Sequence, residues 1–190
     1  MKALKDRIEA DGVAIGTEIV KVDSFLNHQI DVALVDEIGK EFERRFHGQG
    51  VTKILTVEAS GIAIACMAAK YFGNVPVVFA KKATPNTMTE DFYGAEVKSF
   101  TKGITSIVKV SKKYISQEDR ILILDDFLAH GEAAIGMAEL VKQAGAELVG
   151  IGAVIEKRFQ GGSHRLKEKG YHVESLAIID SIKEGKINFL

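Results

Sequence analysis

Two adjacent acidic residues, Asp125 and Asp126, follow the apolar run Ile121–Leu124 and precede a short loop, Ala129–Ala133. The apolar run is typical of a buried parallel strand, and open α/β sheets bind ligands at the carboxyl ends of their strands. The loop leads into a helical pattern, so its backbone N–H groups would point outwards and could hold a phosphate. Carboxylates that can accept hydrogen bonds from a diol, beside a phosphate-binding loop, indicate a site for a phosphorylated ribose.

Three further segments follow predicted core strands and would reach the same edge of the sheet. The small-residue loop Glu58–Gly61 could present N–H groups to an anion, although taken alone it is more typical of an ordinary strand-to-helix turn. Lys81 and Lys82 could neutralise a diphosphate, but exposed loop lysines are often only solvated. Lys157 follows another apolar strand, and Phe159 is near enough to stack on a flat ring. The alternative is that Lys157 is a surface charge and Phe159 part of the core.

The elements that must position these segments alternate between strand and helix. Asp31 can cap a helix whose apolar residues Val35, Ile38, Phe42 and Phe46 keep helical spacing. Strands are predicted at residues 53–57, 76–80, 120–124, 148–155 and 173–179, and further helices at 2–10, 62–72, 132–143 and in a short stretch ending at residue 169. Strand-helix-strand units form parallel sheets with right-handed crossovers. The predicted fold class is therefore α/β, with a central, mostly parallel sheet flanked by helices.

Two regions depart from this alternation. Residues 13–22 are predicted to be extended, residues 24–30 an irregular turn, and residues 186–190 an edge strand. Residues 81–117 begin with a polar, turn-rich stretch and continue as two strands, 96–100 and 104–110, around a Lys-Gly turn. An insertion of this kind after a core strand predicts a lid over the site.

The composition indicates one domain of a soluble protein. The chain has 190 residues, 46% of them hydrophobic, and a net charge of −1, which favours neither nucleic acid nor membrane as a partner. Its single cysteine, Cys66, excludes an internal disulfide and lies in an apolar run, where a packed thiol is expected. The N-terminus lacks the apolar core of a signal peptide, and no run approaches the length of a membrane span. We therefore expect a cytoplasmic protein.

The acid pair with its loop resembles the phosphoribosyl diphosphate (PRPP) signature of the type I phosphoribosyltransferases. The resemblance implies that fold, with Asp125 and Asp126 as catalytic residues that hold the ribose hydroxyls. It also implies two sets of PRPP-binding residues. The 5′-phosphate would be wrapped by Ala129, His130, Gly131, Glu132 and Ala133, and the diphosphate held by Ala59, Ser60, Gly61 and Lys81, often through a non-proline cis peptide. The family's usual loop, Thr-Gly-Gly-Thr, carries hydroxyls that this loop lacks, so the phosphate would rely on backbone donors and the helix dipole.

The likeness extends over nearly the whole chain to one subgroup, the enzymes that use xanthine. It runs through Val20–Asp31, Pro76–Lys81 and Val154–Lys157. It implies a hood formed by residues 1–30 and the C-terminal segment, in which Val20 packs beside the base and Asn27 bonds to it, while Lys157 contacts an exocyclic oxygen. An amide suits xanthine because the 2-oxo group needs a donor. The resemblance further implies transfer of phosphoribose from PRPP to N9 of xanthine, substrate-bridging Mg²⁺ without a dedicated metal site, and a homodimer.

Three alternatives remain open at this stage. A phosphoribosyltransferase for adenine, guanine or hypoxanthine would share every site except the contacts to the base. A PRPP-sensing regulator on the same fold would act on nucleic acid, but the residues before the first core strand are neither basic nor arranged as a winged helix. A receiver-type phosphoacceptor could use Asp125 and Asp126, but a phosphate-binding loop directly after the pair argues against it.

Overall fold

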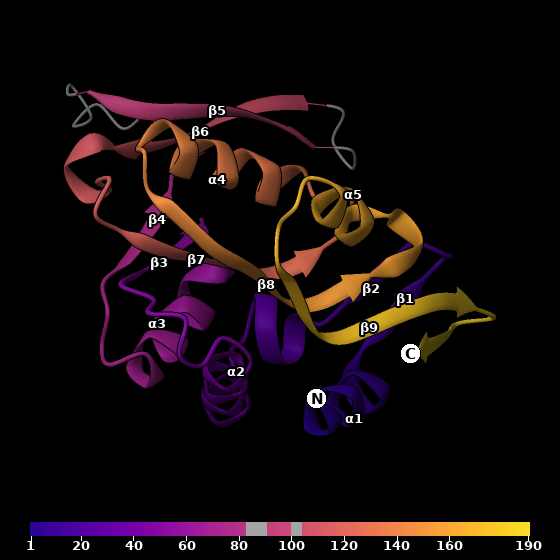
Figure 1. Ribbon diagram of the computed structural model, residues 1–190. Coiled ribbons are helices and arrows are strands. Elements are labelled where there is room, and N and C mark those ends of the chain that lie inside the picture. The colour runs from indigo at the N-terminus through magenta and orange to yellow at the C-terminus, as the bar shows by residue number, and fades with distance from the viewer. Residues whose placement is uncertain (83–90, 100–103) are drawn as a thin grey trace.

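A six-stranded sheet with the strand order β10-β9-β8-β7-β3-β4 forms the centre of the molecule (Figure 1). The computed structural model describes residues 1–82, 91–99 and 104–190. The strands of this sheet are β3 (Lys53–Val57), β4 (Val77–Ala80), β7 (Arg120–Leu128), β8 (Glu147–Lys157), β9 (Val173–Lys183) and β10 (Lys186–Phe189). All neighbours pair in parallel except β10, which runs antiparallel to β9. The predicted α/β class with a mostly parallel sheet is confirmed.

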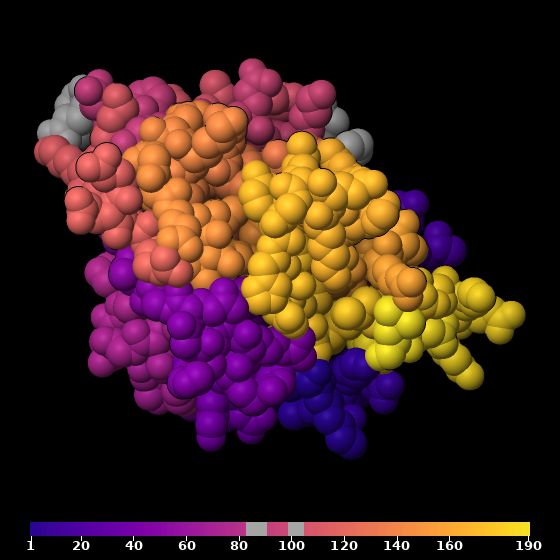
Figure 2. Space-filling view, viewed as in Figure 1, coloured from indigo at the N-terminus to yellow at the C-terminus, as the bar shows by residue number. Residues whose placement is uncertain are grey.

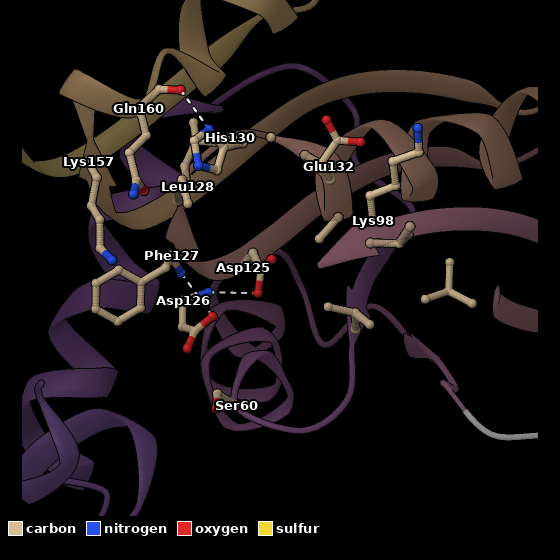
Figure 3. A pocket seen from close by; sticks show the side chains of 18 of the residues that line it. Ser60, Lys98, Asp125, Asp126, Phe127, Leu128, His130, Glu132, Lys157 and Gln160 are labelled. Atoms are coloured by element: carbon tan, nitrogen blue, oxygen red, sulfur yellow. Dashed lines mark hydrogen bonds between the residues drawn. The ribbon is translucent and has the colours of Figure 1, made fainter. Parts of the chain in front are cut away.

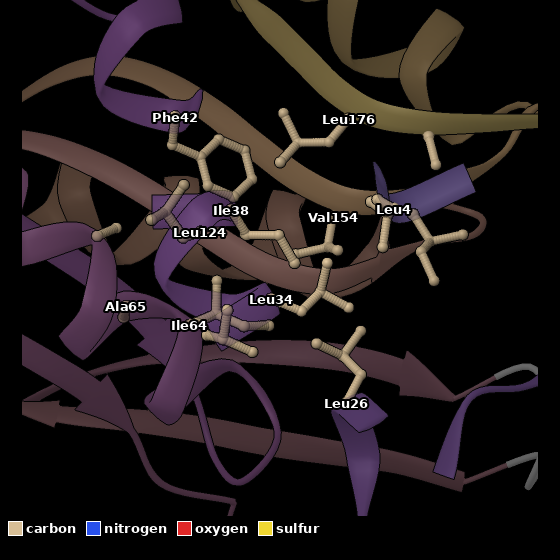
Figure 4. Packing of buried hydrophobic residues seen from close by; sticks show 14 of the residues in the cluster. Leu4, Leu26, Leu34, Ile38, Phe42, Ile64, Ala65, Leu124, Val154 and Leu176 are labelled. Carbon is tan, nitrogen blue, oxygen red and sulfur yellow. The ribbon is translucent and has the colours of Figure 1, made fainter. Parts of the chain in front are cut away.

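Helices cover both faces of this sheet and produce two hydrophobic cores. The helices are α1 (Lys2–Asp11), α2 (Val32–Arg45), α3 (Gly61–Tyr71), α4 (Glu132–Gln143) and α5 (Gly162–Glu168). Successive strand residues point to opposite faces. On β7, Leu122 and Leu124 therefore join the core beneath α1, α2 and α3, whereas Ile121 and Ile123 join the core beneath α4 (Figures 1 and 4). Burial on both faces explains why this strand is apolar at every position.

Helix α2 begins where its cap was predicted. Asp31 Oδ1 accepts a hydrogen bond of 3.1 Å from the Leu34 N–H, and the four predicted apolar positions are all buried. On the outer side, Glu41 accepts hydrogen bonds from Arg44 Nε and Arg45 Nε at 2.8 and 2.9 Å. The Arg44 guanidinium, helped by that of Arg45, lowers the pKa of Glu41 to about 2 against the opposing effect of burial. Arg45 also reaches Glu174 of β9, so this cluster ties α2 to the sheet.

Replacing Glu41 with glutamine is expected to destabilise the protein at neutral pH by about 1 kcal/mol, the upper range for ion pairs near a surface. The folded-state pKa lies below the ordinary 4.5, so this contribution is present above pH 4.5 and is lost as the pH falls towards about 2. Thermal melts at pH 7 should show a Tm lower by about 2–4 °C. The difference in Tm between wild type and variant should become smaller below pH 4.5. Glu37→Gln, an exposed position on the same helix, is the control; equal effects of the two substitutions would contradict the prediction.

The two ends of the chain lie side by side. The N-terminal amino group donates a hydrogen bond of 2.5 Å to the Leu176 carbonyl of β9, and Lys5 Nζ donates to the Leu190 carbonyl. Figure 2 shows the N-terminal atoms, in indigo, against the C-terminal atoms, in yellow. After α1, the stretch predicted as simply extended forms a hairpin of β1 (Val13–Ile15) and β2 (Ile19–Lys21). A π-helical turn, Asp23–Asn27, overlaps the first half of the predicted irregular turn.

A second hairpin lies across α4, on the side away from the sheet (Figure 1). It consists of β5 (Phe92–Ser99) and β6 (Ile104–Ser111), paired antiparallel. Gln143 at the end of α4 donates a hydrogen bond of 2.9 Å to the Gly94 carbonyl. The first strand starts earlier than the sequence predicted, because its pairing with β6 extends back to Phe92. The predicted Lys-Gly turn and residues 84–90 of the polar stretch lie outside the described residues.

The prediction that the Cys66 thiol is packed in the core is wrong, because Cys66 is exposed on α3. Before Lys70 and Tyr71 at its end, this helix contains only small or apolar residues, so the sequence pattern did not reveal its outer face. Gly61, Ile64, Ala65, Ala68 and Ala69 are its buried residues. None of the helices in the described part of the chain is long and apolar enough to cross a membrane.

Candidate functional site

A cavity of about 920 Å³ opens at the carboxyl ends of β3, β7 and β8 (Figure 3). Among the predicted site residues it is lined by Ala59, Ser60, Asp125, Asp126, Ala129, His130, Gly131, Glu132, Ala133 and Lys157. Val97, Lys98, Ser106 and Val108 of the β5–β6 hairpin form one wall. Most of the predicted site therefore converges on one cavity, which is large enough for a drug-sized ligand.

The sequence predicted a strand that ends just before the acid pair. In the structure, Asp125 and Asp126 lie within β7, near its end. The strand is longer because its parallel pairing with β8 continues through Asp125, Phe127 and Leu128. Asp125 Oδ1 accepts from the Asp126 N–H, and Asp126 Oδ1 accepts from the Phe127 N–H, both at 2.9 Å. Burial, and secondarily the neighbouring Asp126 carboxylate, raises the pKa of Asp125 well above its usual value. Two crowded carboxyl groups of this kind would be stabilised by a ligand that brings hydrogen-bond donors.

The loop after β7 turns sharply into α4. Gly131 has φ of +84°, the left-handed conformation, and its carbonyl accepts the first helical hydrogen bond, from Ile135, at 2.9 Å. The first N–H groups of any helix have no carbonyl partner within that helix. Since Ala129–Ala133 also line the cavity, this helix start can offer backbone donors and a favourable dipole to an anion without a side-chain hydroxyl.

The loop after β3 forms a second anion-binding candidate. The Glu58–Ala59 peptide bond is cis, as the family resemblance implied. Ala59 and Ser60 line the cavity, whereas Gly61 begins α3 behind it and is not among the lining residues. A side chain at Gly61 would meet Thr56 Oγ1, so glycine allows α3 to start directly against β3.

Of the two lysines that were candidates for the diphosphate, the structure brings only Lys82 to the cavity. Lys82 lines the cavity, and its backbone N–H donates to Glu58 Oε1 at 2.6 Å. Lys81, the predicted diphosphate contact, does not line the cavity. Its backbone pairs with Lys109, and its ammonium group lies 5.8 Å from the centre of the Phe79 ring. Successive residues at a strand end point to opposite sides, so a shift of one position moves the cation out of the site.

Lys157 extends into the cavity beside Phe127 (Figure 3). Its Nζ atom lies 5.4 Å from the centre of the Phe127 ring. Burial lowers the pKa of Lys157, although the carboxylates of Glu18 and Asp126 oppose this effect. The aromatic residue at this point is therefore Phe127, which sequence reasoning missed, and not Phe159, which is 39% exposed and does not line the cavity. The position of Phe127 directly after the acid pair was the available signal.

Asn27 approaches the acid pair from the N-terminal segment. Its Nδ2 atom donates to Asp126 Oδ2 at 2.5 Å and lies 3.4 Å from Ser60 Oγ. Its Oδ1 atom is buried and has no hydrogen-bond partner in the described part of the chain. Asn27 does not line the cavity, and the Nδ2 donor expected to meet the base is directed at Asp126 instead. Val20, by contrast, is buried in the core, and the neighbouring Glu18 and Ile19 line the cavity instead.

The donor set does not form a metal cage. Within residues 1–82, 91–99 and 104–190, no group of three or more His, Cys, Asp or Glu side chains could hold a metal ion. Two adjacent carboxylates do suit Mg²⁺, which keeps several waters and is often bound through one or two carboxylates and substrate phosphates.

The fold and this cavity define a class of protein. A family model described as the phosphoribosyl transferase domain matches residues 21–187, and the chain belongs to this family. Within it, a xanthine phosphoribosyltransferase of Ruminiclostridium cellulolyticum is 58% identical over 189 residues, which cover 100% of this chain and 99% of the relative. A xanthine phosphoribosyltransferase of Clostridioides difficile is 54% identical and is covered, like this chain, over 100% of its length.

Solved structures agree on the fold. An adenine phosphoribosyltransferase of Trypanosoma brucei, in complex with AMP, pyrophosphate and ribose-5-phosphate, matches with a TM-score of 0.75 at 19% identity. The match covers 92% of this chain and 79% of that one. At this low identity the likeness supports the arrangement of strands and helices alone.

Proposed function

We propose that this protein is a xanthine phosphoribosyltransferase, which transfers the 5-phosphoribosyl group from PRPP to N9 of xanthine and releases XMP and diphosphate. One observation carries the proposal: an acid pair and a hydroxyl-free helix-start loop face the same cavity. The full-length relatives named for this activity support the choice of xanthine.

PRPP occupies the part of the cavity between β3 and β7 in this proposal. Asp125 and Asp126 accept hydrogen bonds from the 2′- and 3′-hydroxyls of the ribose. The Ala129–Ala133 loop surrounds the 5′-phosphate with backbone N–H groups. Ala59, Ser60 and Lys82 hold the diphosphate, with Lys82 in place of Lys81 because only Lys82 lines the cavity.

Xanthine occupies the space beside Lys157 and Phe127. Xanthine loses a proton near neutral pH, so the Lys157 ammonium group can stabilise the anionic base, and the Phe127 ring supplies an aromatic surface. Asn27 acts in this proposal through Asp126, because its Nδ2 atom donates to Asp126 Oδ2. It supports the ribose subsite from the side of the N-terminal segment.

The reaction needs no covalent nucleophile. N9 forms a bond to C1′ as the bond from C1′ to diphosphate breaks, and the bonding electrons leave with the diphosphate. The protein acts by positioning the two substrates and by placing the Asp125 and Asp126 carboxylates near the positive charge that develops on the ribose. Bound Mg²⁺ would neutralise part of the diphosphate charge. The β5–β6 hairpin forms a lid that excludes water, which would otherwise consume PRPP.

The proposal extends to the setting in which the enzyme works. We infer that it acts in purine salvage in the cytoplasm and that its assembled form is a homodimer. The hood of residues 1–30 and the C-terminal segment completes the base subsite. No nucleic-acid or membrane partner is required for the reaction.

A panel of purines tests the substrate directly. With PRPP and Mg²⁺ present, xanthine is expected to give the highest kcat/KM, and guanine and hypoxanthine values lower by about tenfold or more, because an unmatched polar group in the base subsite costs about 1–3 kcal/mol. The nucleotide formed from each base is identified by mass spectrometry. A higher kcat/KM with guanine or adenine than with xanthine would contradict the proposed specificity but leave the PRPP site intact.

A further inference from the structure

A second loop supports the phosphate loop from behind. This bracing loop, residues 160–165, includes the first four residues of α5 and makes three contacts with the phosphate loop, Ala129–Ala133. The Gly162 N–H donates to the Ala129 carbonyl at 3.0 Å, Arg165 Nη1 donates to the His130 carbonyl at 2.7 Å, and His130 Nδ1 lies 3.2 Å from the Gln160 carbonyl oxygen. Two successive carbonyls of the phosphate loop are thus held by residues more than 30 positions away in sequence.

These contacts orient the donors that a phosphate would need. In a trans peptide, the carbonyl of one residue and the N–H of the next point in opposite directions. Because the carbonyls of Ala129 and His130 point at the bracing loop, the N–H groups of His130 and Gly131 point away from it. A loop without side-chain hydroxyls depends entirely on this orientation.

The two loops approach so closely that only glycine fits between them. A Cβ atom on Gly162 would lie 2.3 Å from the Ala129 carbonyl oxygen and 2.8 Å from the Gly131 nitrogen. Both of those atoms belong to backbone and cannot turn aside. The Gly161-Gly162 pair in the sequence therefore allows the bracing loop to reach the phosphate loop.

The bracing loop also neutralises the negative charge of Glu132. Glu132 lies in the phosphate loop with its side chain only 19% exposed, and a bound phosphate would be repelled by its carboxylate. Arg165 Nη1, the same atom that holds the His130 carbonyl, lies 2.7 Å from Glu132 Oε1. One guanidinium group therefore fixes the backbone of the loop and neutralises its only acidic side chain.

We propose that Arg165 is a positioning residue for the 5′-phosphate of PRPP, acting through the His130 carbonyl and the Glu132 carboxylate. This inference rests on the proposed function of the Ala129–Ala133 loop. It assigns Arg165 no contact with either substrate. Loss of Arg165 should therefore weaken PRPP binding and leave the affinity for the base almost unchanged.

Calorimetric titration of PRPP and Mg²⁺ into four proteins tests the inference: wild type, Arg165→Ala, Glu132→Gln and the double variant. Arg165→Ala is expected to weaken binding about tenfold or more, since it removes charge-assisted hydrogen bonds. The double variant should bind PRPP at least about threefold more tightly than Arg165→Ala, because the unneutralised Glu132 carboxylate is then gone. Lys167→Ala removes one positive charge from the same helix and is the matched control. Arg165→Lys, which keeps the charge, should lie between wild type and Arg165→Ala.

The outcomes distinguish a failure of the role of Arg165 from a failure of the proposed function. If wild type binds PRPP and Arg165→Ala binds it as tightly as Lys167→Ala does, the role of Arg165 is refuted. If Arg165→Ala binds weakly but Glu132→Gln restores nothing, the charge-neutralising part is refuted. If Arg165→Ala fails to fold, the comparison of Arg165→Lys with wild type decides, and equal affinities would refute the role. Failure of wild type itself to bind PRPP would instead contradict the proposed function.

Discussion

The double substitution Asp125→Asn plus Asp126→Asn is expected to lower kcat for XMP formation by about 100-fold or more, while the protein remains folded. Each asparagine keeps the shape of the acid but removes the negative charge near C1′, where losing one well-placed electrostatic group typically costs 100- to 1,000-fold. Steady-state assays with saturating xanthine and PRPP measure the effect. XMP formation at a near-normal rate would contradict the assignment of the pair to the ribose.

The single substitution Asp125→Asn is expected to stabilise the protein, which provides an internal control for folding. The pKa of Asp125 is raised in the folded protein, so its proton is held more tightly there than in the unfolded chain. The stability that this represents is complete below the unfolded-state pKa and is lost as the pH rises through the folded-state value. At pH 7, well above the ordinary pKa of an aspartate, this part of the stability is reduced, and Asp125→Asn, which carries no titrating group, should raise the Tm of the unliganded protein. A Tm unchanged or lowered at pH 7 and raised only in acid would contradict this account of the pair.

Replacing Lys157 with alanine is the second substitution with a large expected effect. It should lower kcat/KM for xanthine by about 10- to 100-fold, because a hydrogen bond to a charged group contributes about 1.5–3 kcal/mol. The Kd for PRPP should change by less than about threefold, since Lys157 lies beside Phe127 and not at the phosphate loop. Kinetics with varied xanthine and calorimetry with PRPP separate the two effects.

The control for Lys157 is Lys169→Ala, an exposed position directly after α5. It removes the same charge from the same end of the chain without entering the cavity. Equal losses of xanthine use and PRPP binding in Lys157→Ala would indicate a general collapse of the site rather than a lost contact with the base.

Sequence patterns predicted the sheet and the main site because these depend on local signals. A continuous apolar run marks β7 as a strand buried on both faces, and the acid pair at its end lies where ligands bind. Helix α2 could be predicted from the Asp31 cap and the spacing of its apolar residues. Strand ends were less certain, because β7 and β8 extend beyond their apolar runs through mutual pairing.

The parts of the site that the sequence did not reveal depend on side-chain direction and on long-range contacts. Positions 81 and 82 are both lysine, and only the alternation of side chains at the strand end decides which one enters the cavity. Phe159 is close to Lys157 in sequence, whereas Phe127 comes beside Lys157 only through the folding of the chain. The link from Arg165 to Glu132 joins two helices that are separated in sequence, so no local pattern reports it.

The central claim is that adjacent carboxylates and a hydroxyl-free helix start hold the ribose and 5′-phosphate of PRPP in one cavity. Calorimetric titration of the folded wild-type protein with PRPP and Mg²⁺ tests it most directly. We expect saturable binding at one site per chain, with the affinity strongly reduced in the Asp125→Asn plus Asp126→Asn variant. No detectable heat of binding to wild type, or the same affinity in the variant, would contradict the claim.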